Sequence, residues 1–180
     1  MDCYEVIKGV VEVFQICESA NVEGYTIHGT AAAVVHFMLG GLRSLSAGDI
    51  DVFVYKHRDL KCIEKIIKPN YRQIFEKKVK PGRNPIQYGL DIPIDCGKIE
   101  MRMPKYFPRK RKSSYLGVVE PEVSQKVILP KQITKLDEDI AVNLRPLDRV
   151  LEDITRLGKY YSAKYQHYLD LLKRAEFINR

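Results

Sequence analysis

The sequence predicts an α+β fold, in which a mixed β-sheet is flanked by helices and followed by a helical C-terminal segment. Three observations support this class. Residues 2–19 repeat apolar side chains at helical spacing, short apolar runs between glycine and proline turns follow over residues 25–129, and helix-forming residues dominate from Asp137 onward. With 180 residues and 45% hydrophobic content, the chain is large enough for such a core. We therefore expect an α/β domain over residues 1–130 and a helical segment over 131–180 packed on it.

The first part of the chain predicts a helix, a strand and a second helix. Residues 2–19 form an amphipathic pattern, and residues 25–28 are a short strand candidate. Gly29 permits a tight turn, Thr30 is a suitable N-cap, and the run 31–39 is apolar on nearly all sides. Such a helix must be buried. The unpaired N–H groups of its first turn would lie at the end of the strand, where phosphate oxygens bind well.

Two carboxylates follow in the sequence Asp49-Ile50-Asp51-Val52. In a strand, side chains at i and i+2 point to the same side about 6.5 Å apart, so both acids can reach a pair of cations about 4 Å apart. Ile50 and Val52 then face the core. Two uncompensated carboxylates beside a buried strand carry a desolvation cost that a metal ion offsets. The alternative is a strand edge whose acids are solvated or paired with lysines.

The middle of the chain predicts further strands and a basic surface. We expect a basic helix over residues 58–68 and a basic loop, containing prolines, over residues 104–114. Residues 56–114 hold seventeen basic and six acidic side chains, which would favour a polyanionic partner such as a nucleotide or nucleic acid; the alternative is an ordinary solvated surface. Strands are expected over residues 71–80, 86–94, 98–103, 116–119 and 127–129. Two helices are expected after Asp137, broken at Gly158.

Neither the cysteines nor the histidines indicate a metal site. The four cysteines form no CxxC motif, and the four histidines, which lack HxxxH or HExxH spacing, are each interpreted as satisfied or solvated. No apolar run approaches the roughly 20 residues that span a bilayer, and Asp2 and Glu5 stand where a signal peptide carries positive charge. We expect a cytoplasmic protein without membrane contact.

Two motifs, Ile27-His28-Gly29-Thr30 and Gly48-Asp49-Ile50-Asp51-Val52, resemble the core of the DNA polymerase β-like nucleotidyltransferase superfamily. In that superfamily a strand, a glycine turn and a helix precede a strand with alternating aspartates. Within it, Thr30-Ala31 and Arg43-Ser44 look most like the nucleotidyltransferase toxins of type IV toxin-antitoxin systems. The resemblance implies a nucleotidyltransferase-like sheet and an NTP substrate.

The resemblance also implies a reaction and a set of site residues. The activity would move an NMP from an NTP to a hydroxyl acceptor on a protein, an RNA or a small molecule, with Mg²⁺ or Mn²⁺ as cofactor. Asp49 and Asp51 would be catalytic residues and metal ligands. The nucleotide-binding residues implied are Gly29, Thr30, Arg43 and Ser44. An antitoxin-like protein is a further expected partner.

A third carboxylate on a neighbouring strand completes the metal site in the superfamily. Three acids of this chain lie between apolar residues or beside a turn: Asp91, Asp95 and Glu100. Asp91 is the first choice as a catalytic residue and metal ligand because its strand is the most apolar, and Glu100 is second. Asp95 is expected in a turn beside Gly97. The alternative function is a catalytically inactive fold that binds nucleotides or nucleic acid through the basic middle of the chain.

Overall fold

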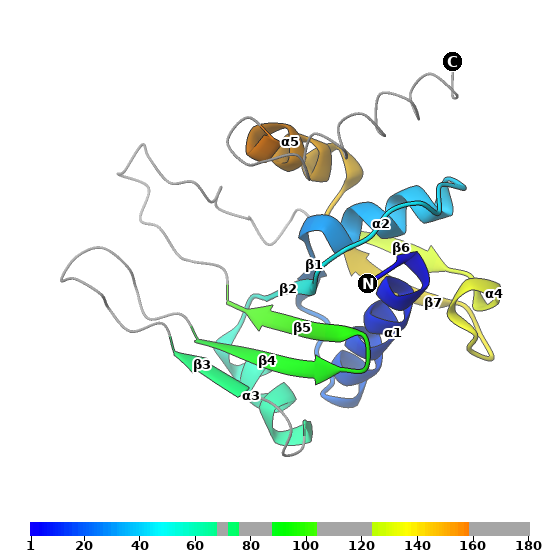
Figure 1. Cartoon of the computed structure of the whole chain (residues 1–180). Helices are drawn as coiled ribbons and strands as arrows, with labels where there is room; N and C mark the ends of the chain where they lie inside the picture. The colour runs from blue at the N-terminus through cyan, green and yellow to red at the C-terminus, as the bar shows by residue number, and fades with distance from the viewer. Residues whose placement is uncertain (68–71, 76–87, 104–123, 159–180) are drawn as a thin grey trace.

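The computed structural model describes residues 1–67, 72–75, 88–103 and 124–158 (Figure 1). Within these ranges, seven strands form one mixed sheet in the order β3-β4-β5-β2-β1-β7-β6, accompanied by five helices. The α+β class with a mixed sheet and flanking helices is therefore confirmed. The helices are α1 (Cys3–Ser19), α2 (Gly29–Leu39), α3 (His57–Ile66), α4 (Lys131–Thr134) and α5 (Leu147–Gly158). The strands are β1 (Tyr25–Ile27), β2 (Ile50–Val54), β3 (Arg72–Phe75), β4 (Tyr88–Ile94), β5 (Gly97–Arg102), β6 (Gln125–Leu129) and β7 (Ile140–Leu144).

Helix α1 is the amphipathic helix expected at the N-terminus. It begins after Asp2, whose side chain accepts backbone N–H groups of the first turn, while the Glu5 side chain accepts the N–H of Asp2 in a reciprocal capping box. Gly9 lets the helix approach β2 closely, since a Cβ atom there would lie 2.9 Å from the Ile50 side chain. Helix α2 lies between α1 and α5 (Figure 1).

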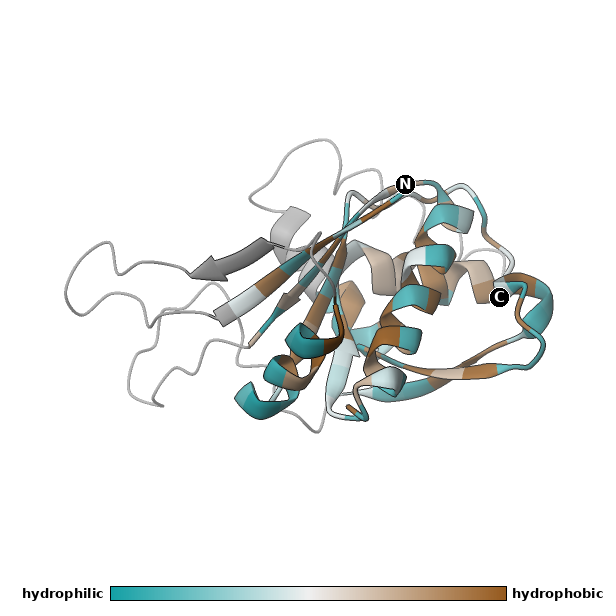
Figure 2. Cartoon of the chain, turned by 90° about the horizontal axis from the view of Figure 1, so that it is seen from below, coloured by the Kyte–Doolittle hydropathy of each residue, from teal (hydrophilic) through white to brown (hydrophobic). Residues whose placement is uncertain are grey.

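The sheet separates an apolar face from a polar face. On β2, Ile50, Val52 and Val54 are buried, and Asp51 and Phe53 between them are half-buried on the other face, as the alternation predicts. β5 repeats this pattern with buried Ile99 and Met101. Brown, hydrophobic residues gather where helices face the strands, and hydrophilic residues lie on the outer helix surfaces (Figure 2). The polar side chains of β2 and β5 therefore lie on the face opposite the one packed on α1.

The structure corrects two expectations about element boundaries. Helix α2 begins at Gly29, and its N-cap is His28 rather than Thr30, with no capping hydrogen bond from the His28 side chain. Residues 140–144 form strand β7 instead of a helix, because Ile140, Val142 and Leu144 alternate inward and pair between β1 and β6. The sheet thus continues past residue 130.

Several expectations fall on residues outside those described. These are the basic loop 104–114, the strand 116–119, much of the strand 71–80 and the chain after Gly158. Among the described helices, none combines the length and the apolar character that crossing a bilayer requires.

Candidate metal centre

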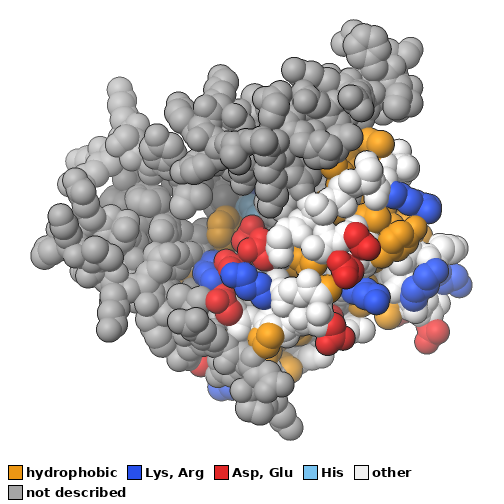
Figure 3. All heavy atoms as spheres, viewed as in Figure 1, with side chains coloured by type: hydrophobic (Ala, Val, Ile, Leu, Met, Phe, Trp, Pro, Cys, Tyr) orange, Lys and Arg blue, Asp and Glu red, His pale blue; other side chains and the backbone are white. Residues whose placement is uncertain are grey.

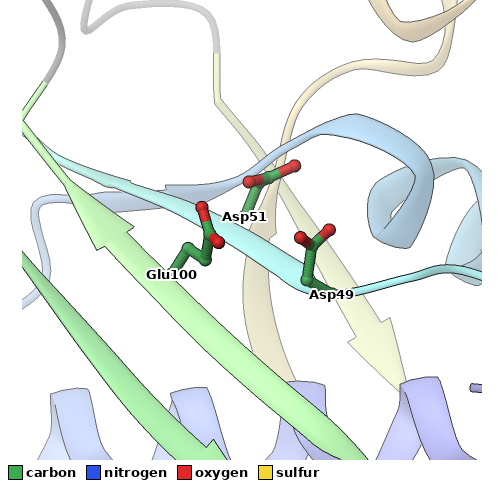
Figure 4. A group of neighbouring side chains, drawn as sticks. All are labelled: Asp49, Asp51 and Glu100. Carbon is green, nitrogen blue, oxygen red and sulfur yellow. The ribbon is translucent and has the colours of Figure 1, made fainter. Parts of the chain in front are cut away.

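Three carboxylates converge on the polar face of the sheet. Asp49, Asp51 and Glu100 each offer one oxygen atom, and these atoms all lie within 4.8 Å of one another (Figure 4). Asp51 on β2 lies directly beside Glu100 on the parallel strand β5, and Asp49 stands just before β2. The side chains point toward one another and away from α1 (Figure 4). The predicted convergence of Asp49 and Asp51 is confirmed.

The third member of this group is Glu100, which replaces Asp91, the first choice from the sequence. Asp91 lies beside Glu100 on β4, one strand farther from β2. Since neighbouring strands are about 4.8 Å apart, Asp91 stands roughly two strand spacings from Asp51. Its carboxylate is paired with Arg102, whose Nη2 lies 2.5 Å from Asp91 Oδ1. The apolar character of the β4 strand therefore did not identify the third carboxylate of this group, because strand order decides which acid lies beside β2.

The glycine turn touches the acidic strand directly. Gly29 has a φ of +62°, which favours glycine, and a Cβ atom there would lie 2.8 Å from Asp51 Oδ2. The His28 N–H donates to the Asp51 carbonyl oxygen at 2.8 Å. Thr30 is half-buried in the first turn of α2, whose N-cap residue, His28, makes no side-chain capping hydrogen bond. The turn, the helix N-terminus and the carboxylates thus form one continuous site.

The group of carboxylates is electrostatically strained. Burial, and then the charges of Asp49 and Glu100, raise the pKa of Asp51 from 3.8 to about 6, although Arg102 and Lys98 act in the opposite direction. A half-buried carboxylate with two acidic neighbours is destabilised when it is ionised. A bound divalent cation removes this repulsion, and hard cations such as Mg²⁺ prefer oxygen ligands of this kind.

Two basic side chains bracket Glu100. Lys98 Nζ donates to Glu100 Oε1, and Arg102 Nη2 lies 3.3 Å from Glu100 Oε2. Acidic and basic side chains accordingly lie side by side on this face of the molecule (Figure 3). Neither cation was identified from the sequence. The signal was their i−2 and i+2 spacing from Glu100, which puts all three side chains on one face of β5.

His28 is a third residue to which the sequence assigned no role in the site. It is only 6% exposed, its ring packs on Phe53 with centroids 4.2 Å apart, and Nε2 has no hydrogen-bond partner within the described chain. Burial, followed by the charge of Arg145, lowers its pKa to about 3, so the imidazole is neutral. The interpretation of every histidine as satisfied or solvated is therefore wrong for His28.

Arg43 and Ser44, two of the predicted nucleotide-binding residues, lie in the loop between α2 and β2. Both are exposed, and Arg43 Nη1 donates to the Tyr4 hydroxyl at 3.1 Å. Their role in nucleotide binding stays a prediction. Comparison of the chain with protein-family models, with curated proteins and with solved structures finds no match.

Proposed function

We propose that this chain is a metal-dependent nucleotidyltransferase of the DNA polymerase β-like type, which moves an NMP from an NTP to a hydroxyl acceptor. One observation supports this above all: the group of Asp49, Asp51 and Glu100 lies against the Gly29 turn. Carboxylates alone would suit many cations. The contact of Asp51 with the Gly29 turn, at a helix N-terminus that the His28 side chain does not cap, supports a place for phosphate beside the carboxylates.

The donor set fits Mg²⁺ or Mn²⁺. All three side chains offer carboxylate oxygens, and the raised pKa of Asp51 reflects its burial and then the negative charges of Asp49 and Glu100. When bound, such an ion supplies positive charge that stabilises the phosphoryl group during transfer. The residues that would hold it are Asp49, Asp51 and Glu100.

The remaining residues of the site are assigned by their positions. Gly29 and the N–H groups of the first turn of α2 bind the β and γ phosphates, because a helix N-terminus suits phosphate oxygens and Gly29 brings this turn against Asp51. Glu100, at the β5 side of the group, takes the proton of the acceptor hydroxyl as its oxygen attacks the α-phosphorus. Pyrophosphate leaves on the opposite side of the phosphorus atom.

Titration calorimetry with each NTP, with and without Mg²⁺, tests this function together with a pyrophosphate-release assay. The wild-type protein should bind at least one NTP in a Mg²⁺-dependent manner and release pyrophosphate, whereas Asp51→Asn should do neither. Asp95→Asn is the matched control, because Asp95 is exposed in the β4–β5 turn. Full activity of Asp51→Asn rejects the assignment. Binding that survives EDTA and weakens steeply with salt indicates the inactive binding module instead.

A further inference from the structure

Arg102 is held in place by the backbone and by two acids. Its Nη1 donates to the carbonyl oxygens of Leu90 at 3.0 Å and Met101 at 3.1 Å, while Nη2 pairs with Asp91 and Glu100. Its side chain is 17% exposed. A guanidinium with four such contacts has little freedom to move, and charge-assisted hydrogen bonds of this kind are the stronger ones in proteins.

The neighbouring strand is shaped to accept Arg102. Gly89 lies directly beside it in the β4–β5 ladder, and a Cβ atom on Gly89 would come within 2.6 Å of Arg102 Cδ and 2.9 Å of Nη1. The absence of a side chain at residue 89 therefore leaves the space in which the arginine lies across β4. This position directs Nη2 to Glu100 Oε2.

Lys98 contacts the other oxygen of Glu100, but its side chain is more exposed to solvent than that of Arg102. The Lys98 side chain is 46% exposed, and among the described residues its hydrogen-bond and ion-pair partner is Glu100. The hydrogen bond with Glu100 is the main reason that the pKa of Lys98 is raised, and the charges of Asp91 and Asp49 add to it. An exposed lysine on a flexible four-carbon stem is easily released from such a pair.

We propose that Arg102 is a fixed counter-charge of Glu100 and Lys98 an exchangeable one, so that Lys98 leaves Glu100 Oε1 when a divalent cation is bound by the three carboxylates. This inference rests on the proposed function. Arg102 is then a positioning residue that keeps Glu100 directed toward Asp51. Lys98 takes the place of the metal charge in the metal-free protein, and its released ammonium group becomes available to an anionic substrate.

The two roles predict opposite changes in metal affinity when the residues are replaced. Lys98→Met removes a competitor and should tighten Mn²⁺ binding roughly two- to five-fold, the range expected for a partly exposed pair. Arg102→Met removes the restraint on Glu100 and should weaken Mn²⁺ binding at least five-fold, as for the loss of a charged hydrogen bond. A purely through-space effect of charge would tighten binding in both variants.

The experiment is Mn²⁺ titration of the nucleotide-free protein, followed by electron paramagnetic resonance, with melting temperatures measured with and without Mn²⁺. Lys126→Met, on the exposed surface of β6 at the far edge of the sheet, controls for net charge. The double variant Asp91→Asn/Arg102→Met avoids leaving Asp91 unpaired if the single variant folds poorly. Lys98→Met should also show the larger Mn²⁺-induced rise in melting temperature.

Each outcome has a separate meaning. Tighter binding by Lys98→Met together with weaker binding by the Arg102 variants supports the inference. If the wild type binds Mn²⁺ and the affinities of the Lys98 and Arg102 variants change in the same direction or not at all, the inference alone is overturned. Wild-type protein that binds Mn²⁺ no better than Asp51→Asn overturns the proposed function, and the inference with it.

Discussion

Replacing Asp51 with asparagine should stabilise the metal-free protein, although it removes a residue that the proposed activity requires. The pKa of Asp51 is raised from 3.8 to about 6 by burial and by Asp49 and Glu100. At about 1.36 kcal/mol for each pKa unit, ionised Asp51 costs the folded state on the order of 3 kcal/mol, and the partial exposure of the side chain makes this an upper value. Asparagine keeps the shape and carries no charge.

The sign of the effect depends on pH. Because the folded protein holds the Asp51 proton more tightly than the unfolded chain, the penalty is absent below about pH 4 and complete above about pH 6. At pH 7.5 in EDTA, Asp51→Asn should therefore melt roughly 5–10 °C higher than the wild type. At pH 4 the two proteins should melt together.

Differential scanning fluorimetry at both pH values, supported by urea unfolding, measures this difference. Asp95→Asn removes an exposed carboxylate of the β4–β5 turn and should give no comparable gain. If Asp51→Asn is no more stable than the wild type at pH 7.5, ionised Asp51 does not destabilise the folded protein and the reasoning is refuted. Equal gains at pH 4 and pH 7.5 refute the assignment of the gain to ionisation.

Three further outcomes follow from the same geometry. Gly29→Ala should lose roughly 1–2 kcal/mol of stability because of the positive φ, and should also lose Mn²⁺ binding because the new Cβ displaces Asp51. Gly41 has a φ of +91°, and apart from its chain neighbours no atom of the described residues lies within 4 Å of an added Cβ, so Gly41→Ala should show the strain alone. Equal Mn²⁺ binding by the two variants contradicts the contact between Gly29 and Asp51. The pKa of His28 is lowered to about 3, so the free energy of unfolding of the wild type should fall by roughly 2–3 kcal/mol between pH 7 and pH 4.5 through this group, whereas that of His28→Gln should not. Matching pH dependence of urea unfolding for the two proteins would disprove a buried neutral imidazole. Asp49→Asn should abolish pyrophosphate release while its circular dichroism spectrum is unchanged, and retained release would remove Asp49 from the site.

Local pattern was enough to predict the part of the site that one segment builds. Asp49 and Asp51 share a face because strand side chains alternate, and Gly29 precedes a helix that is buried on nearly all sides. The contact between the Gly29 turn and Asp51 depends only on β1 and β2 being neighbouring strands. A strand, a turn, a helix and a second strand are short-range features, and the residues themselves indicate them.

The predictions that were wrong concern features that depend on which strands are neighbours in the sheet. Glu100 joins the carboxylate group because β5, and not β4, lies beside β2, and no local property of residue 91 or 100 reveals that order. Residues 140–144 lie in a stretch that favours helix, but they form a strand because β1 and β6 offer hydrogen-bonding edges on both sides. The burial of His28 likewise comes from tertiary packing, in which its ring lies against Phe53 of β2.

The most direct test is a crystal structure with Mn²⁺ and a non-hydrolysable NTP, in which anomalous scattering locates the metal. The site described here predicts a Mn²⁺ peak among the carboxylate oxygens of Asp49, Asp51 and Glu100, with the β and γ phosphates against Gly29 and the first turn of α2. A metal bound elsewhere, or a triphosphate that lies away from the Gly29 turn, would contradict the assignment.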